Sequence, residues 1–257
     1  MTEYPPDMLT PLAAIARSAG ELIMAIYASD FAVEHKTDTS PVTQADQAAE
    51  ALILECLAAL WPDIPVVAEE SVSSSGAPEL AALGQRFWLV DPLDGTREFL
   101  ARNAEFTVNI GLIERGRPVL GVVLAPALGR LWAGQVGQGA WVEDQAGRRP
   151  IQCRAVPPEG LTVVASRSHG DAQALTAFLA GRQLAQTVKV GSSLKLCLIA
   201  EGQADLYPRL GRTMEWDIAA AHAVLAAAGG RVKTLNGSVL EYGKPGFENP
   251  HFVASGI

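Results

Sequence analysis

The sequence lacks the features that mark several common classes of protein. It contains no lysine- or arginine-rich block and has a formal net charge of -8, which argues against a nucleic-acid-binding surface or a polybasic membrane patch. The three cysteines, Cys56, Cys153 and Cys197, are far apart and form no CxxC pair. A zinc site or disulfide framework is therefore not expected, and a reducing compartment fits.

The sequence also has no pattern typical of a targeting signal or a membrane-spanning segment. The first residues, MTEYPPDMLT, have neither the basic segment nor the apolar run of a signal peptide. The most apolar long segment, WDIAAAHAVLAAAGG, is interrupted by Asp217 and His222 and is too short to span a bilayer. We expect a cytoplasmic protein; peripheral association with the inner membrane and the oligomeric state are left open.

The composition is that of a folded protein. Apolar residues make up 49% and charged residues 19% of the chain, so a sizeable core is expected and disorder is not. The length of 257 residues fits one large domain or two fused lobes.

The first part of the chain predicts two helices followed by a strand. Thr10-Pro11 predicts a helix start, with Thr10 as cap, because apolar residues follow at helical spacing. A second helix is predicted over 44–60, and PVVAEE (65–70) predicts a short strand that runs into an acidic turn. The segment SVSSSGAPEL (71–80) has the composition of a loop or a mobile flap.

The order of the predicted strands and helices changes near residue 156. Before it, strands and a hairpin around Arg115-Gly116 predominate, with one short helix beginning at Gly95. After it, strands alternate with helices predicted over 171–181, 192–201 and 216–228. We therefore predict a layered α+β fold with an antiparallel-rich N-terminal part (1–155) and an α/β C-terminal part (156–257).

Carboxylates gather at the ends of predicted elements. Glu69 and Glu70 follow one strand, Asp91 and Asp94 follow another, and Asp217 opens a late helix. Hard cations such as Mg²⁺ prefer oxygen ligands, and a bound cation would offset the repulsion between these groups. The alternative, that Asp91 and Asp94 are ordinary turn and N-cap residues, stays open at this point.

The segment after Asp94 adds a second feature. Gly95-Thr96 begins a short predicted helix, whose free N–H groups can hold a phosphate oxygen.

Three motifs together resemble a known superfamily. DPLDGT (91–96), AEES (68–71) and WDIAAAHAV (216–224) are similar to the signatures of the lithium-sensitive, magnesium-dependent phosphomonoesterases, which include inositol monophosphatase, fructose-1,6-bisphosphatase and the bisphosphate nucleotidases. The resemblance covers nearly the whole chain and implies the αβαβα sugar-phosphatase fold. Ala221 stands where the motif usually has glycine, from which we expect a packing difference only.

The resemblance implies two to three Mg²⁺ ions. Glu69, Asp91 and the carbonyl of Leu93 match one metal site; Asp91, Asp94 and Asp217 match a second; and Glu69 also serves a loosely held third ion. Glu70 either supports these ligands or is a solvated surface charge.

The resemblance also implies a catalytic arrangement. Asp46 matches an aspartate that hydrogen-bonds Thr96, and with Glu69 these residues would orient and activate a water bound to the metal, which attacks phosphorus directly. Without the resemblance, Asp46 would be read as an exposed acid at a helix N-terminus.

The second half of the chain narrows the substrate. SRSH (166–169), GSSLK (191–195) and YPRLG (207–211) resemble the CysQ-type 3′(2′),5′-bisphosphate nucleotidases. This group hydrolyses adenosine 3′,5′-bisphosphate to AMP and phosphate, and 3′-phosphoadenylyl sulfate is a further candidate substrate, with a link to sulfate assimilation. The resemblance implies the following substrate-binding residues: Asp94, Gly95, Thr96, Ser166, His169, Gly191, Lys195, Arg209 and Asp217.

Two other functions remain open from the sequence. One is an inositol monophosphatase, against which Lys195 and the YPR motif argue, because a cation there favours a doubly charged substrate. The other is a catalytically silent sensor of nucleotide or metal, against which the complete set of motif acids argues.

Overall fold

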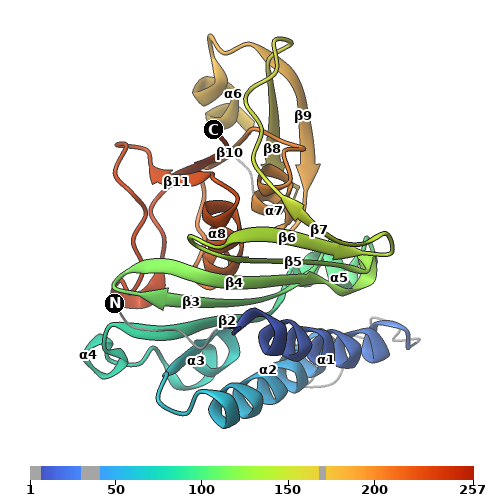
Figure 1. Ribbon diagram of the computed structural model, residues 1–257, viewed down its shortest axis with the longest axis vertical. Helices are drawn as coiled ribbons and strands as arrows, with labels where there is room; N and C mark the ends of the chain where they lie inside the picture. Colours follow the sequence, from blue (N-terminus) through green and yellow to red (C-terminus); the bar gives the residue numbers. More distant parts are fainter. Residues whose placement is uncertain (1–6, 30–40, 168–171) are drawn as a thin grey trace.

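Five layers are stacked in the computed structural model, which describes residues 7–29, 41–167 and 172–257 (Figure 1). Helices α1 (Leu9–Tyr27) and α2 (Pro41–Leu60) cover the outer face of a first sheet. Helices α7 (Leu194–Ala200) and α8 (Ala219–Ala227) lie between this sheet and a second one, and α6 (Ala172–Leu179) covers the far side. The predicted αβαβα layered α+β fold is confirmed.

The first sheet has seven strands in sequential order. Strand β1 is parallel to β2, and each later strand is antiparallel to the one before it. The hairpin predicted around Arg115-Gly116 is confirmed, because it joins the third and fourth strands. The strands are β1 (Val66–Ala68), β2 (Arg86–Asp94), β3 (Thr107–Glu114), β4 (Arg117–Ala125), β5 (Arg130–Gln135), β6 (Gly139–Asp144) and β7 (Gly147–Ile151).

The second sheet has five strands in the order β11-β12-β10-β8-β9. Strands β10, β8 and β9 are parallel, whereas β12 is antiparallel to both of its neighbours. These strands are β8 (Leu161–Ser166), β9 (Leu184–Val190), β10 (Leu206–Arg209), β11 (Arg231–Thr234) and β12 (Phe252–Ser255). The two sheets thus use separate parts of the sequence, and the proposed subdomain boundary near residue 156 falls between them.

Helix α1 begins one residue before its predicted cap, Thr10. The helix begins at Leu9 with Met8 as its N-cap residue, so Thr10 is not the cap, and the carboxylate of Asp7 accepts the main-chain N–H of Thr10 at 3.0 Å. By length and composition α1 could cross a membrane, but a buried core helix passes the same test, and Leu12, Ala16 and Ile23 of α1 are fully buried.

The acidic turn and loop predicted after β1 are in part a helix. Helix α3 covers Glu69–Ser75, so the loop prediction for 71–80 was wrong for its first half. The reason is Glu50 on α2, whose carboxylate accepts the N–H groups of Glu70 and Ser71, each at 2.8 Å, and the Ser71 hydroxyl at 2.6 Å. This cap comes from a distant part of the sequence and leaves no local signal.

The segment that carries Asp91 and Asp94 is a strand and not a turn. Strand β2 continues to Asp94, with a break in register after Asp91. Asp91 pairs with Asn109 and Asp94 with Thr107 on β3. A bulge of this kind redirects side chains near active sites and brings both carboxylates to the same end of the sheet.

Helix α8 lies on a row of glycines. Gly111, Gly121 and Gly134 are direct register partners on β3, β4 and β5. A Cβ on Gly121 would lie 2.3 Å from the carbonyl oxygen of Ala220, and one on Gly111 would lie 2.7 Å from the Ala220 nitrogen. The backbone of α8 therefore touches the sheet, and this contact brings the preceding turn, with Asp217, over β2 and β3.

Two strands were not predicted. Strand β7 is exposed along most of its length and contains arginines that pair with acids of β6, such as Arg148 with Glu143 at 2.9 Å, so it has no apolar alternation. Strand β12 is four residues long, too short for a periodic signal. The short helices α4 (Leu80–Leu83), α5 (Thr96–Leu100), η1 (Pro126–Leu128) and η2 (Pro245–Phe247) complete the described elements.

Candidate active site

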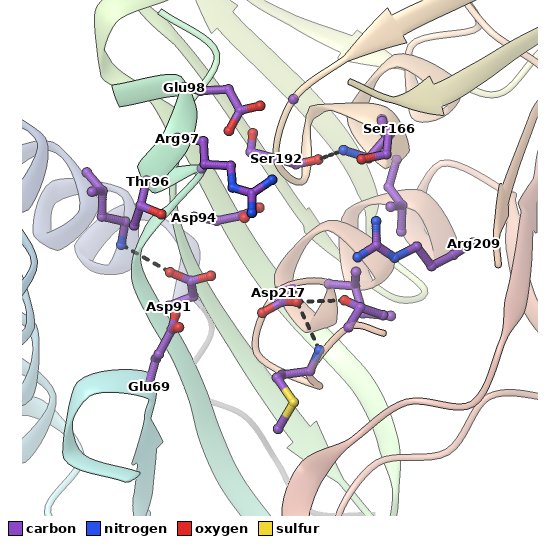
Figure 2. Close-up of a pocket in the computed structure, with 18 of the residues that line it drawn as sticks. Glu69, Asp91, Asp94, Thr96, Arg97, Glu98, Ser166, Ser192, Arg209 and Asp217 are labelled. Atoms are coloured by element: carbon purple, nitrogen blue, oxygen red, sulfur yellow. Dashed lines mark hydrogen bonds between the residues drawn. The ribbon is translucent and has the colours of Figure 1, made fainter. Parts of the chain in front are cut away.

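A cavity of about 400 Å³ lies where the end of β2 meets the C-terminal part of the chain. Five carboxylates line it: Glu69, Asp91, Asp94, Glu98 and Asp217. Lys195 and Arg209 line it as well. Figure 2 shows Glu69 and Asp91 together on one side, Arg209 on the other, and Asp217 facing Asp91 from the α8 side.

Three of the acids converge on one point. Oxygen atoms of Glu69, Asp91 and Asp217 all lie within 4.8 Å of one another. They come from three elements, namely the first turn of α3, the end of β2 and the turn before α8. Such a cluster of carboxylate oxygens has the geometry and chemistry of a hard-cation site.

The electrostatics of this cluster are unfavourable without a cation. Burial, and next the charge of Asp217, raises the pKa of Glu69 to about 7. Burial and Asp217 likewise raise the pKa of Asp94 to about 8, and burial together with Glu69 raises the pKa of Asp91 well above its ordinary value. Bound divalent cations would remove this repulsion, so the residues present fit Mg²⁺.

Asp217 is held by its own turn. The Thr213 hydroxyl donates to Asp217 Oδ2 at 2.6 Å, and the N–H of Met214 donates to the same oxygen at 2.9 Å. Burial raises the pKa of Asp217, and these two hydrogen bonds oppose the rise. With Oδ2 fixed in this way, Oδ1 remains for a ligand.

The turn is anchored from behind by the C-terminal segment. Glu215 is fully buried, and its carboxylate accepts the N–H groups of Gly243 at 2.7 Å and Lys244 at 3.0 Å, as well as the Lys244 ammonium at 2.5 Å. Asn249 donates its side-chain amide to the carbonyl of Met214 at 2.7 Å. These contacts fix the backbone that directly precedes Asp217.

Asp46 has no partner on one of its two carboxylate oxygens among the described residues. It is buried on α2, and its Oδ1 atom has no hydrogen-bond partner among the described residues, so no hydrogen bond to Thr96 forms through that atom. Burial, and then the charges of Glu70 and Glu69, raises the pKa of Asp46 to about 9. Thr96 itself is exposed and lines the cavity at the start of α5.

The main chain between the acids is held by a local hydrogen bond. Leu93 is buried beside Asp91, whose Oδ1 accepts the Leu93 N–H at 3.1 Å. Gly95 has a φ of 95°, a left-handed conformation that glycine adopts without strain, and it opens α5. Glu70 does not line this cavity; its side chain belongs to a different hollow, together with Glu50 and Ser71.

Lys195 is a buried cation in the cavity wall. Its ammonium donates to the carbonyls of Val190, at 3.3 Å, and Ser192. Burial lowers the pKa of Lys195 to about 8, whereas the charge of Asp94 acts in the opposite direction. Lys195 therefore lies close enough to the carboxylates to share one bound ligand with them.

The other predicted substrate residues have different positions. Ser166 and Gly191 line the cavity, but the Gly191 N–H already donates to Glu105 at 2.7 Å. Arg209 lines the cavity and donates to the carbonyl of Arg212. His169 lies outside the described residues.

Ser192 and Thr213 are among the residues of the site that were not predicted from the sequence. Ser192 lines the cavity in a left-handed conformation with φ of 43°, and its hydroxyl is buried without a hydrogen-bond partner among the described residues. Its place beside Lys195 in GSSLK was the available signal. Thr213 precedes Asp217 by four residues, a spacing that gave no signal because the turn between them is irregular.

Comparisons with known proteins agree with this geometry. The family model described as the inositol monophosphatase family matches residues 6–255. The chain is 50% identical over 248 residues to the 3′(2′),5′-bisphosphate nucleotidase CysQ of Salmonella typhimurium, covering 95% of this chain and 98% of the relative. It is 48% identical over 251 residues to the protein of the same name from Escherichia coli K12, covering 96% and 99%.

Solved structures show the same fold. The crystal structure of CysQ from Bacteroides thetaiotaomicron matches with a TM-score of 0.85 and 35% identity, covering 96% of this chain and 97% of that one. An inositol monophosphatase from Anabaena matches with a TM-score of 0.73 and 25% identity, covering 96% and 89%.

Proposed function

The chain belongs to the inositol monophosphatase family, and we propose that it is a magnesium-dependent 3′(2′),5′-bisphosphate nucleotidase of the CysQ type. Its substrate would be adenosine 3′,5′-bisphosphate, from which it removes the 3′-phosphate to give AMP and phosphate. 3′-Phosphoadenylyl sulfate, which carries the same 3′-phosphate, is a second proposed substrate. We also propose a cytoplasmic location.

The observation that carries the proposal is the presence of opposite charges in one cavity. A cluster of carboxylates suited to Mg²⁺ and the buried Lys195 line the same space of about 400 Å³. A substrate with one phosphate needs only the first of these features. A second phosphate at a fixed distance gives Lys195 a charged partner and explains why a cation is buried there despite its desolvation.

The proposed metal ligands follow the motif positions. Glu69, Asp91 and the Leu93 carbonyl would hold one Mg²⁺; Asp91, Asp94 and Asp217 a second; and Glu69 a third, more weakly. When bound, Mg²⁺ supplies Lewis-acid stabilisation of the phosphoryl oxygens and eases deprotonation of the attacking water.

The chain's own groups would complete the reaction. Asp46 and the Thr96 hydroxyl would orient the attacking water, whose proton passes through that hydroxyl to the ionised carboxylate of Asp46, while the N–H groups at Gly95 and Thr96 would hold a phosphoryl oxygen. A P–O bond forms to the water oxygen, the bond from phosphorus to O3′ breaks, and O3′ takes a proton from solvent. Ser166, His169, Gly191, Lys195 and Arg209 would hold the rest of the nucleotide.

A substrate comparison tests the proposal. Phosphate release is measured with Mg²⁺ from adenosine 3′,5′-bisphosphate, inositol 1-phosphate and fructose 1,6-bisphosphate at matched concentrations. We expect the nucleotide to give the highest kcat/KM and lithium to inhibit. A preference for either sugar phosphate contradicts the substrate assignment, and the absence of release from all three favours a silent sensor.

Inositol monophosphatase activity is the second candidate. The observation in its favour is the fold shared with the Anabaena inositol monophosphatase, whose TM-score is 0.73. Inositol 1-phosphate carries one phosphate and has no second phosphate for Lys195 to bind. The same assay decides between the two functions.

A further inference from the structure

Three buried polar side chains form a closed ring of hydrogen bonds beside the active site. The Asn109 amide donates to Thr107 Oγ1 at 3.2 Å, the Ser193 hydroxyl donates to Asn109 Oδ1 at 2.6 Å, and the hydroxyls of Thr107 and Ser193 lie 2.9 Å apart. Thr107 and Asn109 are 0% exposed and Ser193 is 2% exposed. Each member of the ring both donates and accepts a hydrogen bond within it.

The ring joins the two halves of the cavity. Thr107 and Asn109 lie on β3, directly opposite Asp94 and Asp91 of β2. Ser193 lies in the connection between β9 and α7, on the opposite wall. One side of the ring is therefore attached to the strand pair that carries the metal-binding acids, and the other to the GSSLK segment.

Lys195 depends on the same segment. Its ammonium donates to the carbonyls of Ser192 and Val190, and the residue sits in the first turn of α7, directly after Ser193 and Leu194. A second contact between the two walls runs in parallel, since the Gly191 N–H donates to Glu105 at 2.7 Å. The position of the Lys195 ammonium relative to Asp94 is thus fixed by the segment that the ring holds.

The Ser193 hydroxyl is used in an unusual way. Serine in this position normally caps the helix that follows it, but Ser193 makes no side-chain cap to α7. Its hydroxyl instead crosses to β3. A satisfied buried polar network of this kind specifies one arrangement of the elements it joins, because any shift leaves desolvated groups unpaired.

We propose that Thr107, Asn109 and Ser193 are positioning residues that set the distance between the metal-binding carboxylates and the Lys195 ammonium, and thereby select substrates with two phosphates. This inference rests on the proposed function. A substrate with one phosphate contacts only the carboxylate side of the cavity, so its binding does not depend on that distance. A bisphosphate contacts both sides, so its binding depends on that distance.

The test compares two substrates in variants of the ring. In Ser193→Ala and Thr107→Val, kcat/KM for adenosine 3′,5′-bisphosphate should fall about tenfold, mainly through KM, and at least five times more than for adenosine 3′-monophosphate. In the same variants, the dissociation constant of adenosine 5′-monophosphate, measured by calorimetry, should rise. Thr107→Ser keeps the hydroxyl and should retain the unaltered protein's preference for the bisphosphate.

A double variant separates positioning from general loss of structure. If the ring acts through Lys195, then Ser193→Ala should have little further effect on the bisphosphate in a Lys195→Met background. Thr162→Val is the matched control: Thr162 is 4% exposed and accepts a hydrogen bond from Arg154 at 3.2 Å in the second sheet, away from the ring. It should not change the ratio of the two substrates.

Several outcomes would overturn the inference. These are equal losses on both substrates, unchanged bisphosphate kinetics, or an additive effect in the Lys195→Met background. Thr107→Val keeps the shape of the side chain and gives the answer if Ser193→Ala does not fold. Failure of the proposed function is distinguishable, because in that case the unaltered protein itself shows no preference for the bisphosphate.

Discussion

Gly121 and Ala220 are in direct backbone contact. A Cβ placed on Gly121 would lie 2.3 Å from the Ala220 carbonyl oxygen, closer than any real side chain can approach. Gly121 is on β4 and Ala220 is in the first turn of α8, two residues after the turn that holds Asp217. The missing side chain therefore determines how closely Asp217 approaches the carboxylates of β2.

Gly121→Ala should both destabilise the protein and reduce activity. The methyl group must push α8 away from the sheet, which typically costs about 1–3 kcal/mol for an overpacked core, and Asp217 moves with it. Denaturant unfolding measures the first effect, and kcat at saturating Mg²⁺ the second. Gly137→Ala is the control, since Gly137 has φ of 86° and open space around it. It should lower stability through backbone strain and leave activity unchanged, whereas unchanged activity in Gly121→Ala would contradict the role of the contact.

Asp91→Asn should remove most of the activity. Asp91 is shared by both proposed metal sites, so the variant loses one negative charge from each, and we expect kcat to fall by at least about 100-fold. Stability in the absence of Mg²⁺ should not fall, because the substitution relieves the repulsion that raises the pKa of Asp91. Near-normal turnover of Asp91→Asn would exclude the proposed metal arrangement.

Lys195→Met should discriminate between substrates. Loss of a charged hydrogen bond to the second phosphate costs about 1.5–3 kcal/mol, which corresponds to a fall of roughly 10- to 100-fold in kcat/KM for adenosine 3′,5′-bisphosphate. The monophosphate, adenosine 3′-monophosphate, should be affected much less. Lys233→Met changes an exposed lysine on β11 and serves as the control for net charge. Equal losses on both substrates would show that Lys195 has a structural role only.

The sequence predicted the chemistry of the site better than its supporting structure. Glu69, Asp91, Asp94 and Asp217 line one cavity as expected, because each lies in a short motif at the end of an element. Glu50 as the cap of α3 and the glycines under α8 were not found, since each acts across a long distance in the sequence. Local propensity therefore assigned Ser71–Ser75 to a loop and Asp91–Asp94 to a turn.

His222 should make the protein less stable in acid. Burial, with a smaller contribution from Arg117, lowers the pKa of His222 from 6.5 to about 3, and its Nδ1 lies 2.8 Å from the Tyr242 hydroxyl. The unfolded chain binds more protons than the folded one between these values, so folding stability falls as pH falls from 6.5 towards 3. The unaltered protein should lose about 2 kcal/mol more than His222→Gln between pH 7 and pH 5. Urea denaturation at the two pH values measures this, and equal losses in both proteins would contradict it.

In the proposed complex the 3′-phosphate lies at the carboxylates while the 5′-phosphate faces Lys195. Chromatographic analysis of the nucleotide formed from adenosine 3′,5′-bisphosphate in the presence of Mg²⁺ tests it most directly. We expect adenosine 5′-monophosphate and one equivalent of phosphate. Formation of adenosine 3′-monophosphate, or release of neither phosphate, would contradict it.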